Sequence, residues 1–293
     1  MRFNFLHTPK PPLEFQPAQS LGGFETLEKV EGDRRTLVSL LRGGTPAQQQ
    51  LAEIISPCQR GAWCGSAACR VCGRRFRIYF AGHLAEFIAT DYADWCAVSL
   101  VPADQTYPLG RLHQFNPNRF KDRVRRQFER SELKDAAVVL GVDFAVQIFN
   151  QPNRAPLWRP HGYMLIRDSS TNVIRAELDK YYPPAQHTPR PIYSRKIDKK
   201  TVLRVTSYAY KCEFKIRTQI VGADGNDDTR GDPLEPRHLL EIAPLLHKWG
   251  FGGRYLLRGF CRTSDPNGKL TLQLNDPLNE FVRIAMSETE PAW

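Results

Sequence analysis

The stretch AAVVLGVDFAVQIFNQPNRAPLWRPHGYMLI, residues 136–166, decides the fold. Its two apolar runs, 136–149 and 162–166, have the composition of buried strands, and Gly141 punctuates the first of them. The residues between the runs, 150–156, are rich in proline and asparagine, which predicts a turn. Two strands joined by a short turn pair as antiparallel neighbours, so this stretch predicts an antiparallel sheet.

Helices and a further strand are predicted ahead of this pair. Apolar residues recur at helical spacing over 76–90, and WCAVSLV at 95–101 has the pattern of a buried strand. Asn116 followed by Pro117 is typical of a helix start, because the side chain can cap the helix and proline suits its first position. The mixture predicts an α+β fold, an antiparallel sheet with flanking helices.

Composition divides the chain into four parts, and a loop separates the last two. Residues 1–55 are rich in proline, glutamine and glycine and are predicted to form a loosely packed N-terminal arm or cap, with one helix near residues 34–41. Residues 56–76 hold most of the cysteines and form a small module, and 77–221 hold the sheet. A glycine- and aspartate-rich loop then leads to 234–293, where we expect a helix followed by a β-hairpin.

The bulk composition is that of a globular protein, with 293 residues of which 41% are hydrophobic and 25% charged. No stretch approaches the roughly 18 apolar residues that a membrane helix needs, so no membrane partner is expected. The N-terminus, MRFNFLHTPKPPLEF, is interrupted by prolines and charges too soon for a secretory signal peptide. We therefore expect a cytoplasmic location.

The net charge is +10, from 41 Lys and Arg against 31 Asp and Glu, which favours a polyanionic partner such as DNA. The basic residues gather in three clusters, at 70–77, at 121–126 and at 195–217. Any one cluster is as well explained by a solvated face, but three together favour a surface that follows phosphates. The candidate nucleic-acid-binding residues are Arg70, Arg74, Arg75, Arg77, Arg195, Lys196, Lys199 and Lys200.

Four of the seven cysteines lie within 15 residues, as Cys58-x5-Cys64-x4-Cys69-x2-Cys72. Closely spaced cysteines on glycine-containing turns provide the four soft ligands of a tetrahedral zinc site. Two disulfides are the alternative, which a cytoplasmic location disfavours, and four unrelated thiols are disfavoured by the clustering. The pattern therefore predicts one structural zinc ion in a small module ahead of the sheet. The remaining cysteines are predicted to be core residues: Cys96, Cys212 and Cys261.

Two further motifs follow in order along the chain. WRPHGYMLI at 158–166 places His161 at the start of an apolar strand, with Tyr163 on the same face. SYAYKC at 207–212 places Tyr208 three residues before Lys211, a spacing that shares one face of a helix. The plainer alternatives are a strand-end histidine and a packed helix aromatic. Tyr210 would face away from Lys211 and is predicted to be buried.

These motifs, in this order, resemble those of the rolling-circle replication initiators and related transposases, the HUH endonuclease superfamily. VSLV at 98–101 stands where the family has its first strand motif, RPHGYMLI stands at the second, and Tyr208 to Lys211 at the third. A cysteine-rich zinc segment ahead of the first motif is also similar to plasmid, phage and transposon members. The resemblance covers roughly residues 56–220 and implies a HUH/Rep-like fold.

The resemblance also implies an activity. A Rep-like protein nicks and rejoins single-stranded or origin DNA through a covalent phosphotyrosine, here with Tyr208 as nucleophile and Lys211 and His161 assisting. It further implies Mg²⁺ or Mn²⁺ at His161, where the ion would polarise the scissile phosphate.

The sequence departs from the family at the second motif, because Tyr163 stands where the family has its second histidine. A neutral phenol is a poor ligand for Mg²⁺ or Mn²⁺, so either Asp143 or His113 completes the site or metal binding is weakened or lost. Two alternatives to a nuclease therefore stay open. One is a degenerate relative that binds DNA without cutting it, and the other is an unrelated zinc-stabilised nucleic-acid-binding protein.

Overall fold

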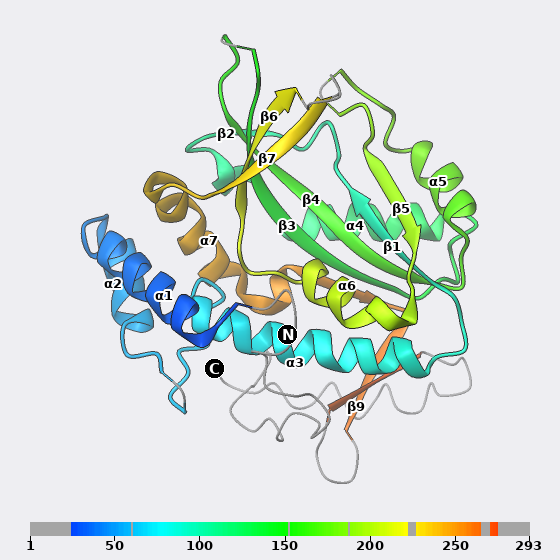
Figure 1. The fold of residues 1–293 in the computed structure, drawn as a ribbon, viewed down its shortest axis with the longest axis horizontal. Helices are drawn as coiled ribbons and strands as arrows, with labels where there is room; N and C mark the ends of the chain where they lie inside the picture. The colour runs from blue at the N-terminus through cyan, green and yellow to red at the C-terminus, as the bar shows by residue number, and fades with distance from the viewer. Residues whose placement is uncertain are drawn as a thin grey trace.

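The computed structural model describes residues 25–59, 61–151, 153–186, 188–221, 227–264 and 270–274. At its centre lies a curled sheet in the order β5-β1-β4-β3-β6-β7, with β2 added to β4 and β8 added to β3 (Figure 1). The strands of this sheet are β1 (Trp95–Leu100), β2 (Tyr107–Pro108), β3 (Val138–Ile148), β4 (Leu157–Arg167), β5 (Ile192–Lys196), β6 (Lys215–Val221), β7 (Asp227–Pro233) and β8 (Tyr255–Arg258). The fold is α+β, as the sequence predicts.

The strand pair predicted from residues 136–166 is confirmed. β3 and β4 run antiparallel, and their register places Asp143 opposite His161 and Gly141 opposite Tyr163. β3 is buried along nearly its whole length, because its residues are apolar on both faces and both faces are covered. β1, predicted at 95–101, pairs with the other side of β4.

The prediction of a wholly antiparallel sheet is wrong at one pair of strands. β6 runs parallel to β3, with Ala145 opposite Lys215, so the sheet is mixed. Parallel neighbours require a crossover connection. Here the chain leaves the sheet edge at β5, passes through α6 (Val202–Ala209) and enters β6 beyond β3. The crossover therefore carries the motif with Tyr208 across one face of the sheet (Figure 1).

Helices cover both faces of the sheet. On the face that carries Tyr163, α3 (Arg70–Thr90) packs against α6, and its Phe76 and Phe80 stack with Tyr255 of β8. On the opposite face, α4 (Pro117–Glu129) and α7 (Pro236–Gly253) pack. There the Trp249 ring lies 5.5 Å from the Phe144 ring, stacked on it. The layers thus put α3 and α6 on one side and α4 and α7 on the other (Figure 1).

Capping follows the sequence signals at several helix starts. The Asn116 side chain accepts hydrogen bonds from the backbone N–H groups of Asn118 and Arg119, which confirms the start of α4. The remaining short helices are α5 (Thr171–Asp179), η2 (Leu112–Gln114) and η3 (Lys199–Thr201). Within the described part of the chain, no helix is both long enough and apolar enough to cross a bilayer.

The described end of the predicted arm is not loosely packed. Residues 27–55 form two helices, α1 (Leu27–Arg42) and α2 (Pro46–Ile55), and bury Leu41 and Ile55 in the same core as the sheet. α1 contains the helix predicted near residues 34–41. The proline- and glutamine-rich composition concealed the second helix, α2, which a Thr45 capping box starts. This segment belongs to the core, at the left edge of Figure 1.

The hairpin predicted near the C-terminus begins later than expected. β9 (Phe260–Ser264) pairs with β10 (Leu270–Leu274), and the predicted turn at 265–268 lies outside the described residues. The break falls at Gly259, whose φ is +74° and whose added Cβ would lie 2.9 Å from the Ala137 Cα. Only glycine tolerates both conditions, so the chain leaves β8 there.

Candidate functional site

A buried carboxylate holds the centre of the candidate site. Asp143 Oδ2 lies 3.1 Å from His161 Nε2 and 2.9 Å from Lys211 Nζ. Burial alone would raise the pKa of Asp143, but the attraction of Lys211 and His161 outweighs burial and holds that pKa well below its usual range. Burial likewise disfavours a charged Lys211, and the Asp143 carboxylate outweighs it and raises the pKa of Lys211. The pair is therefore ionised at neutral pH.

Tyr208 lies against this ion pair and opens to solvent. Its side chain is 49% exposed, and Lys211 Nζ lies 4.8 Å from the centre of its ring. The predicted proximity of the two residues is found, although not through a shared helix face. α6 ends at Ala209, and the turn that follows returns the Lys211 side chain to Tyr208.

Tyr163 faces Tyr208 from the sheet. The two rings meet edge to face with centroids 5.6 Å apart, a favourable aromatic geometry. Burial raises the pKa of Tyr163, and a hydrogen bond from Arg195 opposes that rise in part. Tyr163 and His161 lie two residues apart on β4 and so share its α6 face, as predicted. Tyr163 is thus a neutral phenol that contacts Arg195.

A missing side chain allows α6 to approach the sheet. A Cβ built on Gly141 would lie 3.0 Å from the Ala209 carbonyl oxygen and 3.1 Å from the Tyr210 ring. Tyr210 is fully buried here, as the sequence predicts. Glycine at position 141 therefore fixes how closely the segment that carries Tyr208 packs onto β3.

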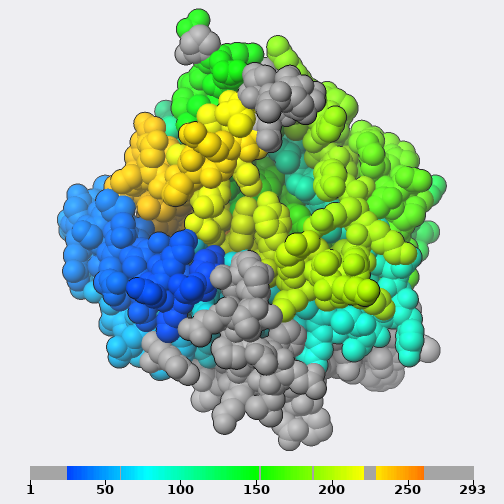
Figure 2. Space-filling model, viewed as in Figure 1, coloured from blue at the N-terminus to red at the C-terminus, as the bar shows by residue number. Residues whose placement is uncertain are grey.

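The basic cluster at 195–217 begins on β5 and continues into the segment that carries Tyr208. Figure 2 shows a hollow bordered by β6 and β7 on one side, β5 on the other and α6 below, with the sheet at its floor. The predicted residues of this cluster are all exposed: Arg195, Lys196, Lys199 and Lys200. Lys196 pairs with Asp94 at 2.8 Å, and Lys199 donates to the Asp91 carbonyl group. Arg195 is the member that contacts the tyrosine pair, through Tyr163.

The arginines of the basic cluster at 70–77 contact other parts of the chain, whereas a phosphate-binding surface was predicted. Arg77 is buried, where it pairs with Glu25 at 2.7 Å and donates to the Ser207 carbonyl oxygen at 2.7 Å. Arg70 pairs with Glu25 and Asp33 and donates to the Cys212 carbonyl oxygen. These contacts tie α3 to α1 and to the α6 region, so they argue against phosphate contact by Arg70 and Arg77.

The other two arginines of this cluster also have contacts within the chain. Arg74 donates to the Glu25 carbonyl oxygen at 2.7 Å, and the Arg75 guanidinium lies 4.4 Å from the centre of the Trp63 ring. The sequence did not reveal that these arginines connect elements within the fold, because their partners Glu25 and Ser207 are distant in sequence.

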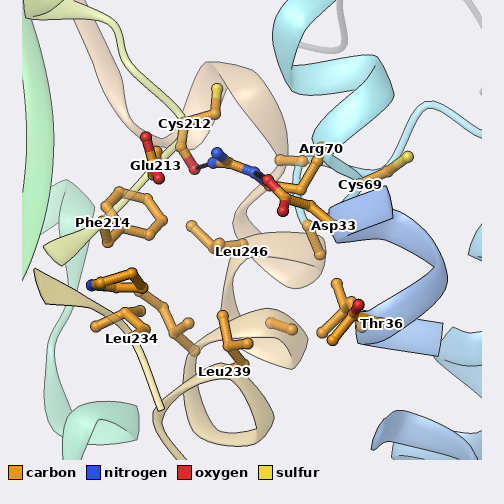
Figure 3. Close-up of a pocket in the computed structure, with 16 residues that line it drawn as sticks. Asp33, Thr36, Cys69, Arg70, Cys212, Glu213, Phe214, Leu234, Leu239 and Leu246 are labelled. Carbon is orange, nitrogen blue, oxygen red and sulfur yellow. Dashed lines mark hydrogen bonds and ion pairs between the residues drawn. The ribbon is translucent and has the colours of Figure 1, made fainter. Parts of the chain in front are cut away.

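A cavity of about 240 Å³ lies beside Arg70, between α1 and α7 (Figure 3). Apolar side chains such as Leu239 and Leu246 line most of it, while Arg70, Asp33 and Glu213 lie along one side. The close-up shows Arg70 reaching from α3 towards both the Asp33 carboxylate and the Cys212 carbonyl group. The cavity is separate from the tyrosine site, since none of its lining residues belongs to that site.

The four predicted cysteines come together. Cys72 Sγ lies 3.5 Å from Cys58 Sγ and 3.6 Å from Cys64 Sγ, and the ligand atoms of all four cysteines lie within 4.8 Å of one another. Neighbouring sulfurs and burial raise the pKa of Cys69 and of Cys72, so the four thiols cannot all ionise unless a cation compensates their charge. The cluster can hold a metal ion.

Local structure explains how the cysteines meet. Cys69 is the residue before α3 and Cys72 lies in the first turn of that helix, while Cys58 follows α2. Gly61 and Gly65 have φ values of +92° and +70°, which allow the tight turns between them. Outside the cluster, Cys96 and Cys212 are buried free thiols, as predicted, and the side chain of Cys261 lies outside the described part.

The predicted divalent-ion site is not completed. Over the described ranges, the four cysteines are the only group of three or more His, Cys, Asp or Glu side chains close enough to hold an ion. Of the two residues predicted to complete the site, Asp143 does lie beside His161, but His113 is not close to them. The expected third ligand is therefore missing from this part of the chain, and Lys211 occupies the space beside Asp143.

Replacing Lys211 by methionine is expected to cost about 3 kcal/mol or more of unfolding free energy, since it removes one partner of a buried ion pair. Urea unfolding measures this. The matched control is Lys196→Met, which breaks an exposed ion pair and should cost less than about 1 kcal/mol. The double variant Asp143→Asn with Lys211→Met should recover at least half of the loss. Equal costs for the two single variants would contradict the electrostatic account.

The geometry brings together five side chains that the sequence singles out: Asp143, His161, Tyr163, Tyr208 and Lys211. Sequence reasoning missed the role of Gly141, although its interruption of an apolar strand was a signal of close backbone approach. It also could not foresee that Lys211 would share the Asp143 oxygen with His161. Comparison of the chain with models of protein families, with curated proteins and with solved structures finds no match.

Proposed function

We propose that this protein nicks and rejoins single-stranded DNA through a covalent bond between Tyr208 and a DNA phosphate. One observation carries the proposal: Tyr208 is half exposed while its ring lies against Lys211, which pairs with the same Asp143 oxygen that His161 contacts. A surface tyrosine needs no such support for stability. An accessible tyrosine with a fixed positive charge against its ring suits the role of an attacking nucleophile.

The reaction exchanges one phosphorus–oxygen bond for another. The Tyr208 oxygen attacks the phosphorus of a phosphodiester, and the bond to the 3′ oxygen of the preceding nucleotide breaks. The phenolic proton ends on the leaving oxygen, so the products are a tyrosine bound to the 5′ phosphate and a free 3′ hydroxyl. Rejoining is the reverse reaction, which the conserved bond energy permits. The Lys211 ammonium stabilises the added negative charge.

Zinc is the metal that the cysteine cluster fits. Zinc–thiolate bonds of about 2.3 Å in a tetrahedron place neighbouring sulfurs about 3.8 Å apart. The distances of 3.5 and 3.6 Å from Cys72 Sγ to Cys58 Sγ and Cys64 Sγ are close to that spacing. Four thiolates close the coordination shell, so the ion would stabilise the fold and take no part in chemistry.

The exposed basic residues beside the hollow support a nucleic-acid partner. Arg195 reaches the tyrosine pair, and Lys200 and Arg204 are exposed at the start and on the outer side of the segment that carries Tyr208. With the net charge of +10, they favour a path for a phosphate backbone towards Tyr208.

The test uses a randomised library of labelled single-stranded oligonucleotides, because the recognised sequence is open. The wild-type protein should form an adduct that survives denaturing electrophoresis, and mass spectrometry should place the nucleotide on the peptide that contains Tyr208. An adduct on Tyr163 or Tyr193 would contradict the assignment of the nucleophile. Tight binding without an adduct under every ionic condition would instead support a protein that binds DNA without cutting it, which the phenol at Tyr163 favours.

A further inference from the structure

We propose that this site acts on a phosphodiester without a divalent cation at His161, and that Lys211 supplies the positive charge in place of the ion. The inference rests on the proposed function, since it concerns how the same site would handle a phosphate. Its direct consequence for ion binding can be measured independently of any reaction.

The first reason is that both ring nitrogens of His161 already face acceptors. Nε2 lies 3.1 Å from Asp143 Oδ2, and Nδ1 lies 3.3 Å from the Arg159 carbonyl oxygen. A carboxylate and a carbonyl oxygen can only accept hydrogen bonds, whereas a histidine binds a metal through the lone pair of a ring nitrogen. An ion at either nitrogen of His161 would therefore have to displace one of these two contacts.

The second reason is that both carboxylate oxygens of Asp143 already have partners within the chain. Its Oδ2 contacts both His161 and Lys211, and its Oδ1 accepts a hydrogen bond from the Phe144 backbone N–H at 2.9 Å. The side chain is only 7% exposed, so water molecules cannot readily complete a coordination shell around it. Mg²⁺ and Mn²⁺ take about six ligands, mostly oxygen. An arriving ion would have to displace the Lys211 ammonium and then lie beside it.

The third reason is the place of Lys211 itself. Its Nζ is 2.9 Å from Asp143 and 4.8 Å from the centre of the Tyr208 ring, so a positive charge already stands next to the nucleophile. An ammonium group has three donors, and Asp143 accepts from one of them. The side chain is 14% exposed, which leaves the others able to meet an oxygen of a phosphate bound at Tyr208.

The first experiment compares adduct formation with and without divalent ions. Zinc-loaded protein is dialysed against buffer freed of Mg²⁺ and Mn²⁺, its zinc content is checked, and the adduct rate is measured on single-stranded oligonucleotides. The rate should agree within about twofold in the two conditions. Lys211→Met should slow it by about 10²-fold or more, with partial recovery in Lys211→Arg. An adduct that forms only with Mg²⁺ or Mn²⁺ would overturn the inference.

The second experiment reads ion binding alone. Mn²⁺ is titrated into the zinc-loaded protein and followed by electron paramagnetic resonance, with melting temperature as the check on folding. We expect no site with a dissociation constant below about 1 mM. A tighter site that disappears in His161→Ala would overturn the inference even if no adduct were ever seen. The absence of an adduct in every condition would contradict the proposed function, while the Mn²⁺ titration would still decide the inference.

Discussion

Replacing Tyr208 by phenylalanine is expected to reduce formation of the DNA adduct by at least about 10⁴-fold, because the only change is the loss of the attacking oxygen. The half-exposed ring keeps its edge-to-face contact with Tyr163, so the free energy of unfolding should change by less than about 0.5 kcal/mol. Affinity for single-stranded oligonucleotides should also be retained. Denaturing electrophoresis, urea unfolding and a binding titration on the same preparation separate the three effects.

Two variants control this result. Tyr92→Phe removes a hydroxyl from a fully exposed tyrosine in the turn after α3, and it should leave the adduct unchanged. Tyr163→Phe removes the hydroxyl of the ring that contacts Tyr208, together with its hydrogen bond with Arg195. If Tyr163→Phe abolished the adduct while Tyr208→Phe did not, the two tyrosines would have to exchange roles.

Replacing Cys69 by serine is expected to lower the free energy of unfolding by about 4 kcal/mol or more, a large share of the 5–15 kcal/mol of a typical protein. The reason is the loss of a proposed metal ligand at Cys69, the residue directly before α3. Urea unfolding measures the change, and elemental analysis should find one zinc ion per wild-type chain and less in the variant. A strong chelator should destabilise the wild-type protein by a similar amount.

The matched control is Cys96→Ser, a buried cysteine outside the cluster that donates to the Ser169 carbonyl oxygen. A serine hydroxyl can make the same hydrogen bond, so this substitution should cost only about 1 kcal/mol. If chelation left the unfolding midpoint of the wild-type protein unchanged and no metal were found, the cysteines would be four packed thiols.

Features that depend on local sequence could be predicted. The β3–β4 pair followed from two apolar runs around a turn, and the start of α4 followed from Asn116 and Pro117. The four cysteines could be grouped because they lie within 15 residues. In each case the chain brings the partners together over a short loop, so spacing alone carries the information.

Features that depend on long-range packing could not be predicted. The parallel pairing of β6 with β3 depends on where the crossover through α6 returns to the sheet, which no local pattern encodes. The fate of the first basic cluster was missed for a similar reason, because Arg77 finds Glu25 some 52 residues away and Ser207 some 130 residues away. An arginine-rich helix turn has the same composition whether it meets solvent or an internal carboxylate.

The places of His161 and Tyr208 were only half predictable. Their order along the chain indicated one site, and the structure does bring their neighbours together. The sequence did not indicate which side chain would lie between His161 and Tyr208. The lysine that was expected to accompany the tyrosine on a helix lies instead beyond the helix end, bonded to the aspartate that was a candidate metal ligand.

The bond from Arg77 to the Ser207 carbonyl oxygen has a mechanical consequence. Ser207 immediately precedes Tyr208, and Arg77 belongs to the helix whose first turn carries Cys72. Helix α3 thus connects the cysteine cluster with the backbone next to the proposed nucleophile (Figure 1). If α3 were loosened at its cysteine end, the Tyr208 hydroxyl would be held less firmly in place. Preparations that differ in zinc content should therefore differ in specific activity before they differ in DNA affinity.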